Sequence, residues 1–211
     1  MKSLKKILVA VSTLLLATSA FADSAGNRDK SIVMLGLTPL GIHLATAATT
    51  PFTVAGFLGK EWMVGVDVGS KSMKETSGNA TATATYSNQG LYGRYFLGNS
   101  FNVSAGYHMR NYSATATATS GSATSTVTLD AKANVLSLGI GNHWMMDWGL
   151  YLGADWLVLG SALSSSSEAT VTATTGGGVS TAKTDTEKIG DLVNAISAAS
   201  GFAVFTIGFA F

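Results

Sequence analysis

A repeated alternation of apolar residues with small or polar ones is the feature of this sequence that most limits its fold, because period-two alternation predicts β-strands. The last segment, GFAVFTIGFAF (201–211), has Phe205, Ile207, Phe209 and Phe211 on one face and mostly smaller residues on the other. Seven earlier segments are also expected to be strands: 31–44, 52–58, 62–74, 81–97, 101–118, 124–144 and 148–166. The sequence thus predicts an all-β fold with eight antiparallel strands.

The connections between these strands alternate in length. Three are short turns, GKE (59–61), GNS (98–100) and MMD (145–147), and the connections between them are long and polar. Bacterial membrane barrels have this asymmetry, with short periplasmic turns and long outer loops. The first two strands have the most mixed faces, and Pro39 cannot donate a hydrogen bond to a closed ladder. We therefore expect a bulge or an early strand end there, and a second bulge near Val135, where the alternation changes phase.

The first 22 residues have the pattern of a secretory signal peptide. Three lysines (Lys2, Lys5, Lys6) precede a mainly apolar run from 7 to 18, and Ala20-Phe21-Ala22 provides a small-x-small cleavage pattern before Asp23. An uncleaved anchor is the alternative, although the run is short for a bilayer span. The sequence predicts a signal peptide at 1–22 and one domain at 23–211, with 10 basic against 12 acidic residues. This balance gives nucleic acid nothing to bind.

The composition limits the classes of exported protein that remain. Apolar residues make up 46% of the chain and charged residues 12%, about half of the usual charged share. There is no cysteine, which excludes disulfides and thiolate metal sites. After residue 22 no apolar run approaches the ~18 residues of a membrane helix. A closed membrane β-barrel and a secreted β-rich polymer both fit these properties.

The positions of the aromatic residues favour the membrane barrel. Five of them lie close to a short turn or to the C-terminal end: Trp62, Phe101, Trp144, Trp148 and Phe211. They are expected to form a girdle at one membrane interface. Trp156 follows Trp148 by eight residues on the same face, roughly 20 Å along a tilted strand, which matches the height of a lipid-facing band. The same alternation predicts that Val66, Val103, Leu138, Leu152 and Val158 face lipid.

With its signal segment, eight alternating strands, short turns and terminal FTIGFAF, the chain resembles the small outer-membrane β-barrels of Gram-negative bacteria, of the OmpA-transmembrane, OmpX and OmpW type. The resemblance is one of architecture over nearly all of 23–211. It implies a multi-pass protein of the cell outer membrane, with outer-membrane lipid and lipopolysaccharide as its surroundings. It also implies that Phe211 belongs to the signal that the barrel assembly machinery reads. A fold of this kind does not fix a function.

Charged and histidine side chains on the small-residue faces are expected inside the barrel. This predicted lumen network comprises Asp67, Lys71, Arg94, His108, Arg110 and Asp155. An eight-stranded barrel is just wide enough for side chains to fill, so a salt-bridged plug is expected. A charged constriction in a narrow pore is the alternative. Asp67 and Arg94 are expected to interact, because they lie on adjacent strands at similar heights.

Two further kinds of segment fall outside the alternation of apolar faces. The Thr/Ala runs NATATATY (79–86), SATATATS (113–120) and EATVTATT (168–175) predict hairpins that extend the barrel wall, as adhesive surface or as simple spacers. In 186–199 the apolar residues Ile189, Leu192, Val193 and Ile196 have helical spacing, which predicts an amphipathic helix at the outer mouth. Thr184 and Glu187 form a capping box, and Gly201 a stop. An irregular upper part of the last strand is the alternative.

No pattern in the sequence indicates an enzyme, a cofactor or a metal site. His108 and His143 lie in no local motif with a serine and an orienting acid, and GIGNHW (139–144) lacks a dinucleotide fingerprint. We therefore expect a monomeric barrel with a structural or surface-interaction role and a closed, side-chain-filled lumen. The alternative is a porin-like passive channel for small, mostly hydrophobic solutes. The two share one fold, so the sequence does not choose between them.

Overall fold

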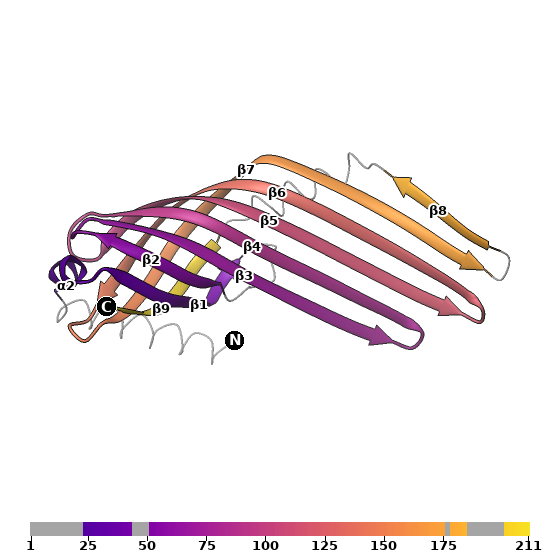
Figure 1. Cartoon of the computed structure of the whole chain (residues 1–211), viewed down its shortest axis with the longest axis horizontal. Coiled ribbons are helices and arrows are strands. Elements are labelled where there is room, and N and C mark those ends of the chain that lie inside the picture. The colour runs from indigo at the N-terminus through magenta and orange to yellow at the C-terminus, as the bar shows by residue number, and fades with distance from the viewer. Residues whose placement is uncertain (1–22, 44–50, 176–177, 185–200) are drawn as a thin grey trace.

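The structure is a computed structural model that describes residues 23–43, 51–175, 178–184 and 201–211. One short helix precedes a single sheet of nine antiparallel strands (Figure 1). The elements are α2 (Ser24–Lys30), β1 (Val33–His43), β2 (Phe52–Leu58), β3 (Trp62–Ser77), β4 (Ala80–Phe96), β5 (Phe101–Ser120), β6 (Ala123–Met145), β7 (Leu150–Thr175), β8 (Gly178–Thr184) and β9 (Gly201–Ala210). The predicted all-β antiparallel fold is confirmed.

The sheet closes on itself. Its order is β6-β5-β4-β3-β2-β1-β9-β7-β8, and β6 also pairs with β7, so every strand except β8 has at least two neighbours. We call this closed part the ring. The prediction of eight strands differs from the nine observed, because 178–184 was expected to be a loop and instead pairs with the end of β7. The ladder between β1 and β9 is irregular between Leu37 and Ile42, around Pro39.

Alternation of side chains along each strand sets the two faces of the ring. Val66, Val103 and Leu138 are 44%, 38% and 58% exposed on its outside, whereas their sequence neighbours point inward. The β6–β7 register shifts between Asn134 and Val135, as the phase change predicted, and again between Ile140 and Gly141. The second shift makes Trp156 an extra residue in β7. The prediction for Val158 is therefore wrong: it lines the inside of the ring.

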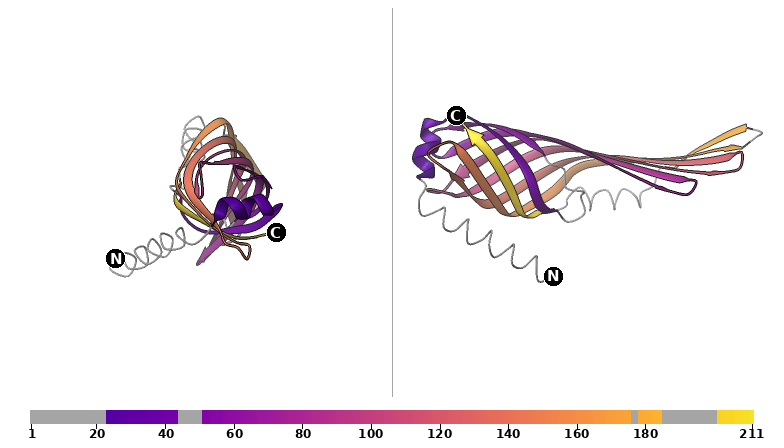
Figure 2. Two further views of the ribbon diagram at one scale, coloured as in Figure 1. Left: turned by 90° about the vertical axis from the view of Figure 1, so that its left-hand side faces the viewer. Right: turned by 90° about the horizontal axis from the view of Figure 1, so that it is seen from below.

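Helix α2 lies across the end of the ring that carries the short turns (Figure 2, left). Asp23 caps it by accepting a hydrogen bond from the Gly26 amide. The side chain of Asn27 donates to the Met145 carbonyl and to the Asp147 carboxylate at 2.9 Å each. This helix was not predicted from the sequence, because seven residues with no apolar stripe carry no periodic signal.

Beyond the ring, five strands continue and β8 joins them in an open sheet that is thin when seen edge-on (Figure 2, right). We call this part the outer sheet; it comprises 70–77, 80–87, 111–120, 123–132, 166–175 and 178–184. One row of cross-strand partners consists entirely of threonines: Thr76, Thr81, Thr117, Thr126, Thr172 and Thr181. Some neighbours share hydroxyl hydrogen bonds, such as Thr117 and Thr126 at 3.1 Å. The prediction that the Thr/Ala runs form extended hairpins is confirmed.

Two predictions lie outside the described residues: the signal peptide at 1–22 and the mouth helix at 186–199 with its apolar residues Ile189, Leu192, Val193 and Ile196.

None of the helices in the described part of the chain is long and apolar enough to cross a membrane.

Candidate functional site: a layered lumen

The inside of the ring is filled in layers, starting with an apolar layer next to α2. Strand alternation brings these buried side chains together from different strands: Met34, Ala55, Phe57, Met63, Phe96, Met145, Tyr151 and Ala210. Met63 and Tyr151 are each 1% exposed. Burial of this apolar surface stabilises the ring in the same way as a small protein core. The layer also separates the polar lumen from the short-turn end.

Arg28 of α2 closes this end from outside the ring. Its guanidinium donates to the backbone carbonyls of Lys60 (2.8 Å), Asn99 (2.8 Å) and Gly98 (3.0 Å), which belong to two different short turns. The guanidinium carbon lies 3.7 Å from the centroid of the Phe96 ring, in a cation–π contact. Burial lowers the pKa of Arg28 to about 10, so it remains charged at neutral pH. One side chain thus ties α2 to the turns and to the apolar layer.

An ion pair forms the next layer. Arg94 donates from both terminal nitrogens to the Asp155 carboxylate, at 2.6 and 3.0 Å, and also hydrogen bonds Asn102. Arg94 is 6% exposed and Asp155 is 7% exposed, so the pair is almost completely removed from water. A bidentate pair of this kind is geometrically specific. Leaving either charge without its partner in this place would be costly.

His143 extends the ion pair toward the apolar layer. Its Nε2 lies 3.0 Å from Asp155 Oδ1, and its Nδ1 lies 2.6 Å from the Tyr151 hydroxyl. A carboxylate can only accept, so in the neutral imidazole Nε2 carries the proton and Nδ1 accepts from Tyr151. The ring lies over Gly153, where an added Cβ would collide with it. Each nitrogen of His143 is therefore occupied.

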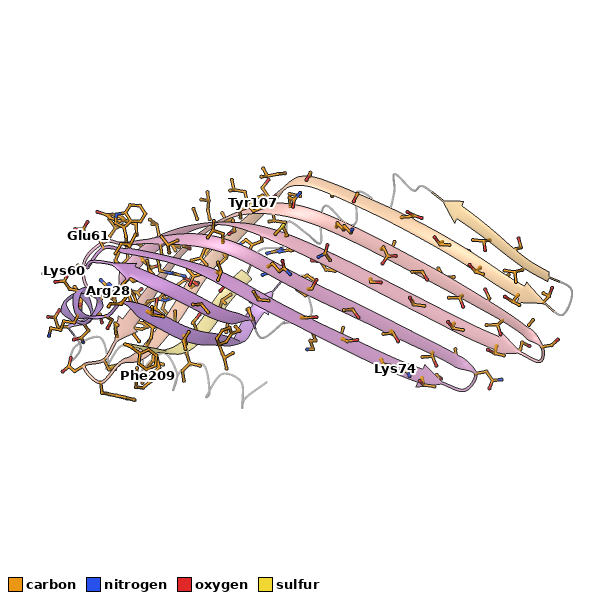
Figure 3. All side chains as sticks on the ribbon, viewed as in Figure 1. Arg28, Lys60, Glu61, Lys74, Tyr107 and Phe209 are labelled. Atoms are coloured by element: carbon orange, nitrogen blue, oxygen red, sulfur yellow. The ribbon has the colours of Figure 1, made fainter. Side chains whose placement is uncertain are left out.

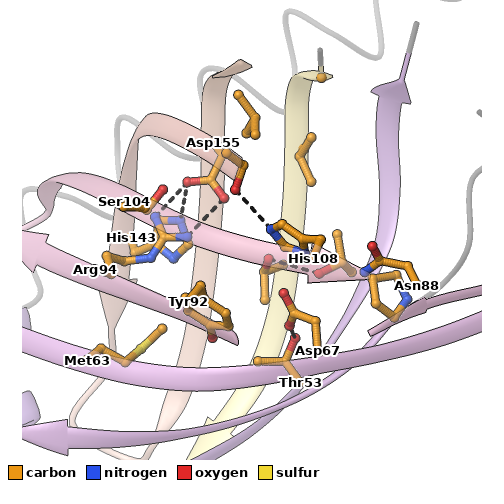
Figure 4. Close-up of a pocket in the computed structure, with 18 of the residues that line it drawn as sticks. Thr53, Met63, Asp67, Asn88, Tyr92, Arg94, Ser104, His108, His143 and Asp155 are labelled. Atoms are coloured by element: carbon orange, nitrogen blue, oxygen red, sulfur yellow. Dashed lines mark hydrogen bonds and ion pairs between the residues drawn. The ribbon is translucent and has the colours of Figure 1, made fainter. Parts of the chain in front are cut away.

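Asp67 lies on the other side of the lumen and does not pair with Arg94, contrary to our expectation. Its Oδ1 accepts a short hydrogen bond from the Thr53 hydroxyl. Asp155 is the ion partner of Arg94 instead. The sequence suggested Asp67 as the partner of Arg94 because the two lie on adjacent strands. The actual partner comes from β7, which faces Arg94 across the lumen. These side chains border a cavity of about 150 Å³ (Figure 4).

His108 also borders the cavity. Its Nε2 lies 2.9 Å from the Ser137 hydroxyl, which in turn donates to the Gly106 carbonyl at 3.4 Å. Its Nδ1 has no hydrogen-bond partner. Among the described residues, neither histidine therefore belongs to a serine–histidine–carboxylate chain of the kind that nucleophilic catalysis uses. The described residues also contain no group of three or more His, Cys, Asp or Glu that could hold a metal ion.

The other predicted network members lie further out. Arg110 lines the outer part of the cavity, next to Asn88 across the β4–β5 ladder. Lys71 is exposed and lies in the outer sheet opposite Tyr86. Of the six predicted lumen residues, Arg94 and Asp155 form an ion pair. Asp67, His108 and Arg110 share the cavity wall, and Lys71 does not.

The predicted aromatic girdle divides in a similar way. Four members are exposed, at 48% for Trp62, 40% for Phe101, 64% for Trp148 and 65% for Phe211. Trp144 does not share this exposure: it is 3% exposed and packs with Ala154, Leu152, Phe205 and Met146. Its neighbour His143 points into the lumen, so Trp144 lies on the outer face of β6, opposite Leu152 of β7.

Several residues of the network were missed from the sequence. His143, Tyr151 and Asn102 were seen as parts of alternating strands, but nothing in a linear pattern shows which strands face each other across a lumen. Thr53 belongs to the strand with the most mixed faces. A useful signal was present in the glycines, since Gly90 and Gly153 are the positions against which the rings of His108 and His143 lie.

Comparison with known proteins gives one informative result. No protein-family model matches the chain, and no curated protein matches it by sequence. Among solved structures, the fold is similar to that of a major outer membrane protein from Thermus thermophilus, with a TM-score of 0.54 and 12% identity. The similarity covers 86% of this chain and 99% of that one. At this identity the likeness shows that the two chains share a fold.

Proposed function

We propose that this protein is an outer-membrane β-barrel with a non-catalytic, structural or surface-interaction role and no through-channel. The ring would cross the membrane, and the outer sheet would project from the cell surface. Outer-membrane lipid and lipopolysaccharide would surround it, and the C-terminal strand β9 would be recognised by the barrel assembly machinery.

The observation that carries the membrane part of this proposal is the outer face of the ring. Rows of cross-strand partners on that face are largely apolar and exposed, as in the row Val66, Leu91, Tyr107 and Leu136, at 44%, 57%, 41% and 43%. Figure 3 shows side chains that project outward from the ring, with the labelled Tyr107 among them. A water-exposed face of this size would be unusual in a soluble protein. It suits the lipid-facing band of a membrane barrel.

The limits of this apolar face support a similar conclusion. In β5, outward residues run from Phe101 to Met109, roughly 20 Å along a tilted strand. The next row outward is polar: Ser70, Ser87, Asn111 and Lys132. The apolar band therefore ends where the outer sheet begins. The structurally similar Thermus protein is a major outer membrane protein, which agrees with this assignment.

The absence of a through-channel is inferred from the layers in the lumen. A solute would have to pass the Arg94–Asp155–His143 cluster, then the apolar layer with Met63 and Tyr151, and finally the Arg28 contacts. These groups are buried and mutually bonded. Such a stack favours the salt-bridged plug over the charged constriction.

Planar-bilayer recording of refolded 23–211 tests this proposal. We expect the protein to insert with conductance no higher than the background of the bilayer. Steady stepwise currents would overturn the closed lumen and would favour the passive channel for small, mostly hydrophobic solutes. Failure to insert into vesicles would overturn the membrane assignment itself. Protease treatment of intact Gram-negative cells that express the chain gives a second readout, since cleavage should begin in the outer sheet.

A further inference from the structure

Asp67 is a lumen carboxylate whose charge no neighbouring base neutralises. One of its oxygens accepts from Thr53. The ion pairs among the described residues give it no partner, because Arg94 is bound to Asp155. An ionised carboxylate in a narrow, partly dehydrated space strongly favours a nearby positive charge. The ion pair of the plug therefore compensates the charge of Asp155 but not the charge of Asp67.

His108 lines the same cavity and has a ring nitrogen with no hydrogen-bond partner. The Ser137 hydroxyl directs its proton to the Gly106 carbonyl, so its oxygen accepts from His108 Nε2–H. In the neutral imidazole this leaves Nδ1 as an acceptor, and Nδ1 is buried without a partner. The hydrogen bonds from Nε2 through Ser137 to the Gly106 carbonyl thus make Nδ1 of His108 a hydrogen-bond acceptor.

Asn88 supplies a third acceptor. Its side chain lines the cavity and the residue is only 8% exposed, yet its Oδ1 is buried without a hydrogen-bond partner. Buried polar atoms are normally hydrogen-bonded, so an orphaned oxygen on a residue that lines a cavity indicates a donor from elsewhere.

Strand register brings these three acceptors together. Asp67, Gly90 and His108 are consecutive partners in one row across β3, β4 and β5. Gly90 has no side chain, which leaves a gap of two strand spacings, about 10 Å, between the backbones of its neighbours. The His108 ring leans over Gly90, where an added Cβ would strike Nδ1. Asn88 lies two residues from Gly90 along β4, and Figure 4 shows these three side chains on one side of the cavity.

We propose that this group, the acceptor site (Asp67, Asn88 and His108), binds the primary ammonium group of a small organic cation. A primary ammonium has three N–H donors and no acceptor, which matches a carboxylate oxygen, an amide oxygen and an imidazole lone pair. Its positive charge compensates Asp67, and the cavity of about 150 Å³ has room for a short carbon chain. This binding site goes beyond the proposed structural role of the barrel.

Metal ions fit the acceptor site less well. Calcium and magnesium are bound mainly by six or more oxygen ligands, and this site has only one carboxylate and one amide oxygen beside its imidazole. Arg110 faces Asn88 across the β4–β5 ladder, two residues beyond His108, and the strand β4 separates it from Asp67 on β3. The three acceptors of this site therefore favour a cation with N–H groups over a bare metal ion.

Titration with methylammonium chloride tests the proposal directly. Refolded 23–211 with ¹⁵N-labelled histidines would be studied in zwitterionic micelles, with the His108 signals assigned from His108→Gln. We expect a saturable shift of the His108 Nδ1 resonance with methylammonium, and at least a tenfold smaller response to sodium or potassium chloride at equal ionic strength. Equal responses to all three salts would mean that the cavity holds only water and bulk ions, which would overturn the proposal.

Matched variants assign the binding to Asp67. Asp67→Asn keeps the shape of the side chain but removes its charge, and we expect it to weaken methylammonium binding at least tenfold. Asp29→Asn changes an exposed acid on α2 and should leave the affinity unchanged. Unchanged binding in Asp67→Asn would overturn the assignment. If that variant does not refold, Asn88→Asp provides the opposite test, because a second carboxylate should tighten binding severalfold.

This experiment is independent of the proposed function. Binding in micelles requires neither membrane insertion nor a closed lumen, so a conducting barrel could still bind methylammonium, and a closed barrel could fail to bind it.

Discussion

The ring and the outer sheet share five strands but are stabilised in different ways. Inside the ring the inward side chains differ from position to position and make individual contacts: Arg94 is bonded to Asp155, and His143 lies between Asp155 and Tyr151. In the outer sheet the same Thr and Ala pairs recur in successive rows, such as Thr117 opposite Thr126 and Thr115 opposite Thr128. The ring depends on individual contacts, whereas the outer sheet depends on a repeated pattern. Single substitutions should therefore have large effects in one region and small effects in the other.

The largest effect is expected from breaking the lumen ion pair. Asp155→Leu leaves the buried Arg94 without its carboxylate, and we expect a loss of about 3–5 kcal/mol in unfolding free energy. Urea titration in micelles, followed by tryptophan fluorescence, would measure it. The double variant with Arg94→Leu should recover part of the loss. The exposed Glu75→Leu in the outer sheet should stay within about 0.5 kcal/mol, and a comparable loss there would remove the contrast between the regions.

An arginine introduced on the outer surface of β6 should have different effects in the ring and in the outer sheet. Leu138→Arg would place a guanidinium on the apolar band and should cost about 2–4 kcal/mol near the middle of a bilayer. Val127→Arg, further along β6 in the outer sheet and 43% exposed, should change stability by less than about 0.5 kcal/mol. Both would be measured by urea unfolding from lipid vesicles. Equal costs would place the membrane boundary elsewhere.

The α2 closure should give an intermediate effect. Arg28→Ala removes three hydrogen bonds to turn carbonyls and the contact with Phe96, and we expect a loss of about 2 kcal/mol. Arg28→Lys keeps the charge without the planar fork and should retain only part of the stability. Lys30→Ala, on the exposed side of α2, provides the control. Faster cleavage of α2 by protease in Arg28→Ala, but not in Lys30→Ala, would show that Arg28 holds the helix.

The smallest effect is expected in the threonine rows. Thr117→Val together with Thr126→Val removes one hydroxyl hydrogen bond and keeps the β-branched shape, so the loss should stay below about 0.5 kcal/mol. Circular dichroism during thermal unfolding would follow it. A loss as large as that of Arg28→Ala would mean that the hydroxyl rows, and not only the strand pattern, hold the outer sheet together.

The sequence predicted the parts of the fold that follow from local alternation. Strand segments, short turns and the outward direction of Val66, Val103 and Leu138 all depend on residues close together in the chain. The misplaced direction of Val158 follows from a register shift, which depends on how β7 meets β6. The Arg94–Asp155 pair joins strands that face each other across the lumen. No linear period shows such a contact, and the same is true of the tie between Arg28 and the turns.

The period-two repeat of the outer sheet affects which insertions and deletions the sequence can tolerate during evolution. Inserting one Ala-Thr pair in each arm of a hairpin preserves both faces and every cross-strand partner, and it lengthens that hairpin by about 6.6 Å. A single-residue insertion would exchange the two faces. The reach of the hairpins is therefore free to grow or shrink in steps of two residues. The ring has no such freedom, because an insertion in one of its strands would change both the strand register that closes the ring and the contacts in the lumen.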